Sequence, residues 1–172
     1  MKLLMRETTP PAHTVYVKGD DVARLQTDEV QAMRRRIGVI YQDYKLLPDR
    51  SVIENIMLPL QLQDIDDATA KERALRLMQE FDFTTKSNTK ASFLSGWEKQ
   101  KVAIMRALIT NPELIIADEP SGNLDRDASQ MITDMLIEIN KRGQTILFIT
   151  HDQHLIEYTQ SKLPWVRITQ IQ

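Results

Sequence analysis

The chain has 172 residues, 42% of them hydrophobic and 27% charged, which is typical of one folded domain and excludes a disordered or fibrous protein. Its formal net charge of −2 gives no general attraction to nucleic acid or anionic lipid, which argues against a DNA-coating role. Because there is no cysteine, disulfides, thiol nucleophiles and thiolate zinc sites are excluded. No apolar run approaches the ~20 residues that span a bilayer, and the first five residues are too short for a signal peptide, so we expect a soluble protein.

Short elements are predicted in the first part of the chain. They are a helical stub and a turn over residues 1–14, a strand at 15–17, a turn at 18–21, a surface helix at 27–36 and an apolar strand at 37–41. The run Arg34, Arg35 and Arg36 has two interpretations. It is either a phosphate-contacting patch or a solvated helix end next to the negative pole of the helix dipole.

Two amphipathic helices are predicted next. Ser51 and Glu54 match a capping box, in which each side chain bonds the other residue's free backbone amide. Apolar residues then recur at helical spacing in two stretches, separated by a polar break over residues 63–69. They are Ile53, Ile56, Met57 and Leu60 in the first stretch, and Ala74, Leu77, Met78 and Phe81 in the second. We interpret the methionines among them as core residues.

The C-terminal half predicts a β-α-β unit. Apolar strands at 114–117 and 145–149 flank an amphipathic helix that ends at Gly143. Unbroken apolar strands are typical of a parallel sheet that is covered on both faces. Polar residues follow both strands directly, and open α/β sheets bind ligands at the carboxyl ends of their strands. The sequence therefore predicts a binding site at this edge.

Taken singly, the polar residues allow ordinary structural interpretations. Asp118 and Glu119 match the pattern of two acidic residues that are exposed to solvent at the end of a strand. Ser95 begins a second capping box. His151 and His154 have the spacing of a metal pair, but no third ligand accompanies them.

The order of these residues along the chain is more specific than any one of them. Gln42 is followed by Leu94-Ser95-Gly96, by Asp118-Glu119, by Gly122-Asn123-Leu124-Asp125 and by Thr150-His151-Asp152. This order resembles the nucleotide-binding subunit of ABC transporters, from the glutamine loop through the signature, Walker B and D-loop to the switch histidine. The resemblance covers nearly the whole chain. Within the family it is most similar to the cell-division FtsE branch and its lipoprotein-exporter relatives, over residues 36–43, 46–50 and 122–125.

The resemblance implies ATP and Mg²⁺ as ligands. Asp118 would hold Mg²⁺, directly or through water, and Gln42 would add an oxygen ligand. Glu119 would position the attacking water as general base, an effect worth about 10²–10⁴ in rate. His151 would bond the γ-phosphate and sense its loss.

The resemblance also implies a head-to-tail dimer. Ser95 and Gly96 would form a nucleotide-binding helix N-terminus that serves the partner subunit's ATP, and Asp125 would lie at the dimer seam. The family signature is Leu-Ser-Gly-Gly, whereas Trp97 stands at the second glycine in this chain. Its indole either blocks the approach of a phosphate or points elsewhere.

The phosphate loop of the family is missing from this sequence. The five glycines, Gly19, Gly38, Gly96, Gly122 and Gly143, are too scattered to form a loop that wraps a phosphate. We expect the chain to begin just after that loop and to lack the family's N-terminal strands. The strand at 145–149 would then have an unpaired edge, which favours association or marginal stability. We also expect Mg-ATP to bind with about millimolar affinity or weaker.

The implied fold is an α/β P-loop NTPase of ABC ATPase type, missing the N-terminal strands and phosphate loop. The whole chain, 1–172, would be one partial domain with a parallel sheet core. A small helical subdomain would cover about residues 43–110, and the part with Walker B, the D-loop and the switch histidine would cover 111–160.

The implied function is that of an FtsE-like subunit that couples Mg-ATP hydrolysis to an integral membrane subunit, an FtsX-like permease in cell division. It would act in the cytoplasm, peripherally on the inner or plasma membrane, without nucleic acid. Two alternatives stay open. One is a degenerate, non-hydrolysing fragment that only binds a partner, which Trp97 favours. The other is a nucleic-acid repair ATPase, which ranks last because the interval from Gln42 to Ser95 has no room for a long coiled coil.

Overall fold

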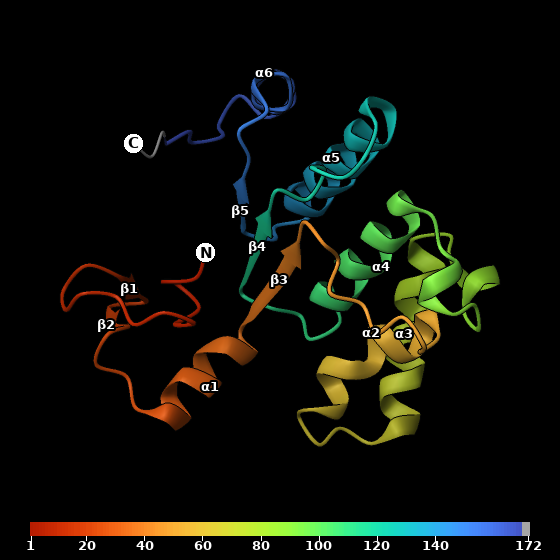
Figure 1. Ribbon diagram of the computed structural model, residues 1–172, viewed down its shortest axis with the longest axis horizontal. Coiled ribbons are helices and arrows are strands. Elements are labelled where there is room, and N and C mark those ends of the chain that lie inside the picture. The colour runs from red at the N-terminus through yellow and green to blue at the C-terminus, as the bar shows by residue number, and fades with distance from the viewer. Residues whose placement is uncertain (170–172) are drawn as a thin grey trace.

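A parallel sheet of three strands runs through the computed structural model, which describes residues 1–169 (Figure 1). In spatial order the strands are β3 (Ile37–Tyr41), β4 (Leu114–Asp118) and β5 (Ile146–Ile149). The helix α5 (Arg126–Lys141) connects β4 to β5, which confirms the predicted β-α-β unit. Gly143, with φ +97°, follows the end of this helix, where a left-handed residue suits glycine.

Most of the remaining helices lie between β3 and β4 along the chain. They are α2 (Val52–Gln61), α3 (Asp67–Glu80), the short 3₁₀ turns η1 (Thr84–Lys86) and η2 (Ala91–Phe93), and α4 (Gly96–Leu108). The predicted capping box is confirmed, since the Ser51 amide donates to Glu54 Oε2 at 2.7 Å. The predicted polar break is wrong at its end. The helix α3 already begins at Asp67, because the Asp66 carboxylate caps it by accepting from the Thr69 amide.

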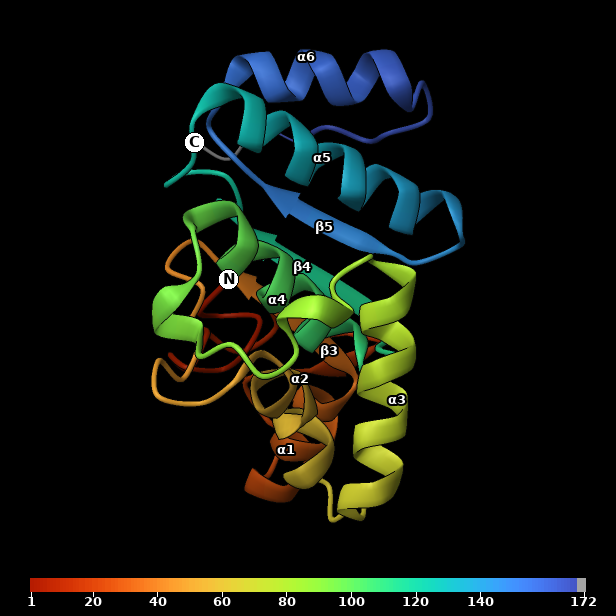
Figure 2. The same cartoon turned by 90° about the vertical axis from the view of Figure 1, so that its right-hand side faces the viewer.

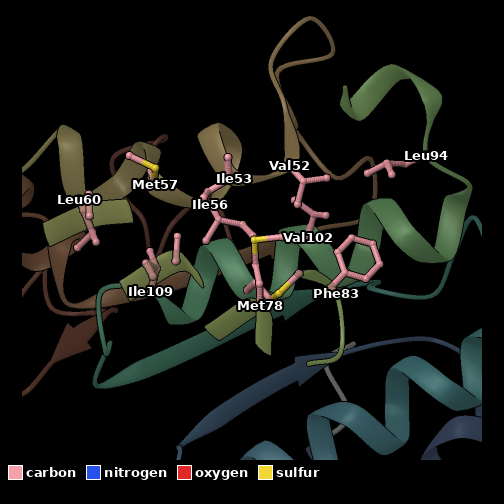
Figure 3. Packing of buried hydrophobic residues seen from close by; sticks show 13 residues of the cluster. Val52, Ile53, Ile56, Met57, Leu60, Met78, Phe83, Leu94, Val102 and Ile109 are labelled. Atoms are coloured by element: carbon pink, nitrogen blue, oxygen red, sulfur yellow. The ribbon is translucent and has the colours of Figure 1, made fainter. Parts of the chain in front are cut away.

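The helices α2, α3 and α4 pack around an apolar core, which we call the helical cluster (Figure 3). Ile56, Met78, Val102 and Met105 are fully buried there. The predicted helical faces, including the methionines Met57 and Met78, therefore point into this core.

Helices cover one face of the sheet, and the N-terminal segment covers part of the other. Residues of α4 and α5, such as Ile104 and Ile132, pack against Ile115 of β4. Met5 and Val22 of the N-terminal segment pack against Ile116 on the opposite face. Figure 2 shows α5 beside β5, with α6 (Gln153–Lys162) beyond it. The predicted cover is incomplete at β5, where Leu147 is 39% exposed.

The N-terminal segment differs from its prediction in two places. The predicted helical stub at the start of residues 1–14 is wrong, because the structure has only turns there. The Met5 amide donates to the Met1 carbonyl and forms one helical turn. Arg6 then adopts φ +50°, so the helix does not continue. The predicted turn at 18–21 is shorter in the structure and consists of residues 18 and 19, since β1 (Tyr16–Val17) pairs with β2 (Asp20–Asp21). The helix α1 (Thr27–Arg35) follows the hairpin, as expected.

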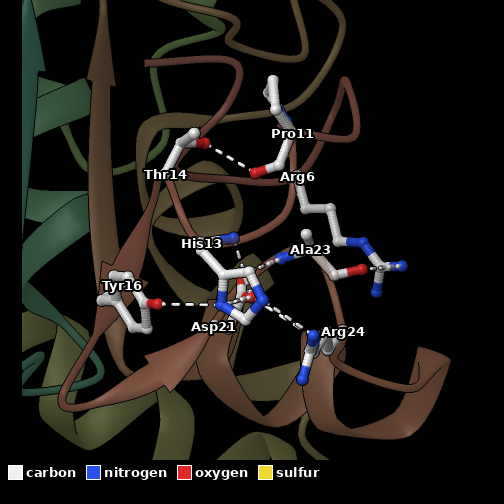
Figure 4. A network of polar contacts seen from close by, with 8 residues as sticks. All are labelled: Arg6, Pro11, His13, Thr14, Tyr16, Asp21, Ala23 and Arg24. Atoms are coloured by element: carbon white, nitrogen blue, oxygen red, sulfur yellow. Dashed lines mark hydrogen bonds and ion pairs between the residues drawn. The ribbon is translucent and has the colours of Figure 1, made fainter.

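A network of polar contacts holds this hairpin (Figure 4). The Asp21 carboxylate accepts from the amides of His13 and Ala23, and Arg24 donates to His13 Nε2 at 2.8 Å.

Among residues 1–169, no helix is both long and apolar enough to cross a membrane.

Candidate functional site

The three strands of the sheet end together at one edge. Tyr41 lies beside Asp118, and Asp118 lies beside Ile149, so the residues that follow the strands emerge next to one another. A cavity of about 500 Å³ opens at this edge. The predicted site residues among its lining are Gln42, Glu119 and His151. The parallel register thus brings together side chains that are far apart in the sequence.

Glu119 is held in a defined position at the carboxyl end of β4. Its φ is +46°, in the left-handed region that residues other than glycine rarely adopt. Its amide donates to the Ile149 carbonyl at 2.9 Å. Strained residues of this kind persist only where the surrounding contacts fix them, and they cluster at functional sites.

The carboxylate of Glu119 bonds to the segment that follows β5. Its Oε1 accepts from the amide of His151 at 2.9 Å and from His151 Nδ1 at 2.6 Å, and its Oε2 accepts from the Thr150 hydroxyl at 3.2 Å. A carboxylate offers about four acceptor positions, so Oε2 retains one for a further donor such as water. This arrangement suits a general base at the cavity wall.

The imidazole of His151 is exposed and paired with this carboxylate. The pKa of His151 is raised above its ordinary value, because its ring donates a hydrogen bond to Glu119 and because the carboxylate charge favours the imidazolium. A protonated His151 presents a donor to the cavity, as contact with an anion requires.

The side chain of Gln42 lies close to Gly122, in the segment that follows Glu119. A Cβ atom on Gly122 would lie 2.7 Å from Gln42 Nε2, so a larger residue than glycine would displace this amide. The side chain of Asn123 donates to the Gln42 carbonyl at 2.9 Å. The Asn123 bond holds the Gln42 backbone, and the Gln42 side chain occupies the space beside Gly122.

Ser95 and Gly96 lie at the start of α4, outside the lining of the cavity. Both the amide and the hydroxyl of Ser95 donate to Glu98 Oε2, at 2.8 and 2.9 Å, which confirms the second capping box. Burial opposes ionisation of Glu98, but hydrogen bonds from Lys86 and Ser95 hold its pKa below the usual value. Gly96 approaches Leu124, where a Cβ atom would lie 3.1 Å from the leucine Cδ2.

Trp97 is the second residue of α4, and its indole lies near Lys101. The ammonium of Lys101, one turn further along the helix, lies 5.9 Å from the Trp97 ring and 5.3 Å from the Phe83 ring. The residue is 37% exposed. Its aromatic face is thus turned toward Lys101.

Asp118 and Asp125 also lie outside the lining of the cavity. Asp118 ends β4 directly before Glu119. The Asp125 carboxylate caps α5 by accepting from the Ala128 amide at 2.8 Å. That bond gives Asp125 a structural task at the start of the helix.

Some residues of the site are not apparent from the sequence. Arg126 and His154 line the cavity, and Arg126 donates to His154 Nε2 at 2.9 Å. This contact joins the first turns of α5 and α6, which no local pattern aligns. His151 and His154 therefore have different partners, Glu119 and Arg126. Thr150 lies in the Thr150-His151-Asp152 motif, but its bond to Glu119 depends on the pairing of β4 with β5.

The residues predicted to hold Mg²⁺, Asp118 and Gln42, both lie at the carboxyl edge of the sheet. Among residues 1–169, no three His, Cys, Asp or Glu side chains are grouped so that they could hold a metal ion. Asp118 ends β4, and Gln42 directly follows β3, whose last residue pairs with Asp118, so each offers an oxygen ligand at this edge. Mg²⁺ keeps several waters and takes one or two protein oxygens together with substrate phosphates, so this pair suits it.

Comparison with known proteins identifies a family and relatives. The family model of the ABC transporter matches residues 1–122. The cell division ATP-binding protein FtsE of Haemophilus influenzae is 38% identical over 157 residues, covering 91% of this chain and 72% of the relative. The lipoprotein-releasing system ATP-binding protein LolD of Bacteroides thetaiotaomicron is 38% identical over 152 residues, covering 87% and 70%.

Solved structures share the fold. A dimeric, post-hydrolysis state of the ATP-binding cassette MJ0796 bound to ADP and Pi has a TM-score of 0.76 at 31% identity, covering 90% of this chain and 69% of that one. A second dimeric structure of MJ0796, described as a bacterial ABC transporter cassette, has a TM-score of 0.78, also at 31% identity, covering 91% and 70%.

Proposed function

The chain belongs to the ABC transporter family as an FtsE-like ATPase subunit, and on that premise we propose that its carboxyl-edge site binds Mg-ATP and hydrolyses it. The observation that carries the proposal is the meeting of Gln42, Glu119 and His151 at one cavity. Glu119 takes the role of base toward water, and His151 that of donor toward the γ-phosphate. Asp118 and Gln42 would hold Mg²⁺, which neutralises phosphate charge when bound.

A nucleotide titration followed by amide NMR tests binding at this site. We expect Mg-ATP to shift the amides of Gln42, Glu119, Gly122 and His151, with about millimolar affinity or weaker, because the sequence has no clustered glycines to wrap the phosphates. NMR detects binding of that strength. Saturation at micromolar concentration would contradict the expected weak affinity, and shifts confined to other surfaces would contradict the proposed site.

Phosphate release tests the chemical role of Glu119. Glu119→Gln removes the base but retains its hydrogen-bonding shape, so we expect hydrolysis to fall about 100-fold or more. Glu157→Gln is the matched control, because Glu157 is exposed on α6 and does not line the cavity. Equal rates in the two variants would remove Glu119 from the mechanism.

We also propose a head-to-tail dimer in which Ser95 and Gly96 face the partner's nucleotide and Asp125 lies at the seam. The two MJ0796 structures that resemble this chain are described as dimeric, which supports the proposal. Sedimentation of the Glu119→Gln variant with Mg-ATP tests it. The expected result is a dimer that depends on nucleotide and is weakened by Asp125→Ala, whereas a monomer at saturating Mg-ATP would contradict it.

For the membrane partner we propose an FtsX-like integral subunit in cell division, with this chain on the cytoplasmic face of the membrane. The name of the FtsE relatives, cell division ATP-binding protein, supports the process. A cavity of about 380 Å³ between α1, α2 and α4 is lined by Arg34, Arg35 and the exposed Leu62. These side chains suit an acidic, partly apolar segment. Co-purification with an FtsX-like protein, abolished by charge reversal of Arg35, is the test.

A further inference from the structure

The turn that follows Gln42 has an unusual backbone. Tyr44 and Lys45 adopt φ of +61° and +49°, so two consecutive residues other than glycine lie in the left-handed region. The Tyr44 amide donates to the Tyr41 carbonyl at 3.1 Å, and the Lys45 amide donates to the Asp43 carbonyl. Side chains disfavour this conformation, so contacts from elsewhere must hold it.

The contacts that hold the turn come from Arg106 in α4. Its Nη1 donates to the Lys45 carbonyl and its Nη2 to the Tyr44 carbonyl, both at 2.6 Å. Within residues 1–169 this guanidinium forms no ion pair, so its two donating arms serve the turn and not a carboxylate. A planar fork matches two neighbouring acceptors in a way that an ammonium cannot.

The tyrosine side chain gives the turn a second contact with α4. A Cβ atom on Gly96 would lie 3.2 Å from the Tyr44 hydroxyl, so the phenol lies against the first turn of this helix. Burial raises the pKa of Tyr44, consistent with that position. The turn therefore touches α4 both near its start and near its end.

We propose that Arg106 is a positioning residue, which holds the turn after Gln42 in its left-handed conformation and thereby places the Gln42 side chain at the site. The inference rests on the proposed function for the role of Gln42, but the contact itself needs no nucleotide. The backbone of Gln42 is then held from two directions, by the turn on one side and by the hydrogen bond from Asn123 on the other.

Hydrogen exchange measured by mass spectrometry on the full chain without nucleotide tests the proposal directly. In Arg106→Gln we expect exchange over residues 43–45 to rise at least tenfold, with α2 and the rest of α4 unchanged. Arg106→Lys keeps the charge but lacks the planar fork, so its exchange rate over residues 43–45 should lie between those of the native chain and Arg106→Gln. Arg73→Gln, on the exposed side of α3, is the control. Unchanged exchange at 43–45, or a uniform rise through α2, α3 and α4, would overturn the proposal.

A rescue variant separates positioning from general stability. Glycine adopts the left-handed region without strain, so Lys45→Gly in the Arg106→Gln background should slow exchange at residues 43 and 44 again. If the turn were held by something other than Arg106, the glycine would have no effect. That result would also overturn the proposal.

A double-mutant cycle tests the link to Gln42. We expect Arg106→Gln to weaken Mg-ATP affinity at least threefold in the native background, and to have no further effect once Gln42 is alanine. Additive losses would overturn the claim that Arg106 acts through Gln42. If no variant, including the native chain, binds Mg-ATP, the proposed function fails while hydrogen exchange still decides the role of Arg106.

Discussion

The helical cluster and the strand β5 are both rich in apolar residues, yet they are buried to very different degrees. In the helical cluster, Val52, Ile56 and Met78 are fully buried between three helices. In β5 no residue is fully buried, and α6 buries only Leu155. The two regions differ in their neighbours and not in their hydrophobicity.

This contrast shows what an apolar run needs in order to stabilise a fold. The helix α2 packs against both α3 and α4, and apolar side chains of all three helices meet in one buried core. The strand β5 pairs with β4 on one side, and within the described residues no strand pairs with its other side. An uncovered apolar side chain contributes little, because burial and not composition supplies the free energy.

The largest expected effect is in the helical cluster. Ile56→Ala leaves a cavity among fully buried side chains, so the free energy of unfolding should fall by about 2–5 kcal/mol. Leu147→Ala in β5 is the matched control, and its loss should be well below that because the side chain is 39% exposed. Urea denaturation measures both. Equal losses would mean that the two regions do not differ as the burial indicates.

A stabilising change of intermediate size is expected at Gln100 in α4. The side chain is fully buried, and neither its Oε1 nor its Nε2 has a hydrogen-bond partner within residues 1–169. An unsatisfied buried amide costs about 1–3 kcal/mol, so Gln100→Met should raise the free energy of unfolding by about that amount. Thermal melts check the direction. A destabilised variant would show that this amide finds a partner in solution.

A smaller effect on stability is expected at the outer strand. Leu147→Lys should change the free energy of unfolding by only about 0.5 kcal/mol, since the side chain is largely solvated. It should nevertheless reduce association, because a lysine on an edge strand discourages pairing with another chain. Light scattering after size exclusion is the measurement. A native chain that is already monomeric, or a variant that associates equally, would contradict the prediction.

The smallest expected effect is a pH dependence at the site end of β5. The pKa of His151 is raised by its hydrogen bond to Glu119, so the pair stabilises the fold fully below the ordinary histidine value of 6.5. The contribution is lost as pH rises through the raised value. The melting temperatures of the native chain and His151→Gln should therefore differ more at pH 5.5 than at pH 8.5. In a Glu119→Gln background this pH dependence should disappear.

The sequence by itself determined most of the local structure. Ser51 and Ser95 mark helix starts through hydrogen bonds with Glu54 and Glu98, three residues further on, so a short window contains both partners. The spacing of Ile53, Ile56, Met57 and Leu60 likewise placed one helical face correctly. The short helical stub predicted at the start of residues 1–14 is wrong, because a positive φ at Arg6 has no signal in composition.

The tertiary structure alone decided how the site is held together. The order of motifs along the chain pointed to Gln42, Glu119 and His151, and the pairing of β3, β4 and β5 brought them to one cavity. The bonds from Thr150 to Glu119 and from Arg106 to the turn after Gln42 join residues far apart in sequence. Local propensity cannot specify such contacts, because their energy exists only after the strands and helices have packed.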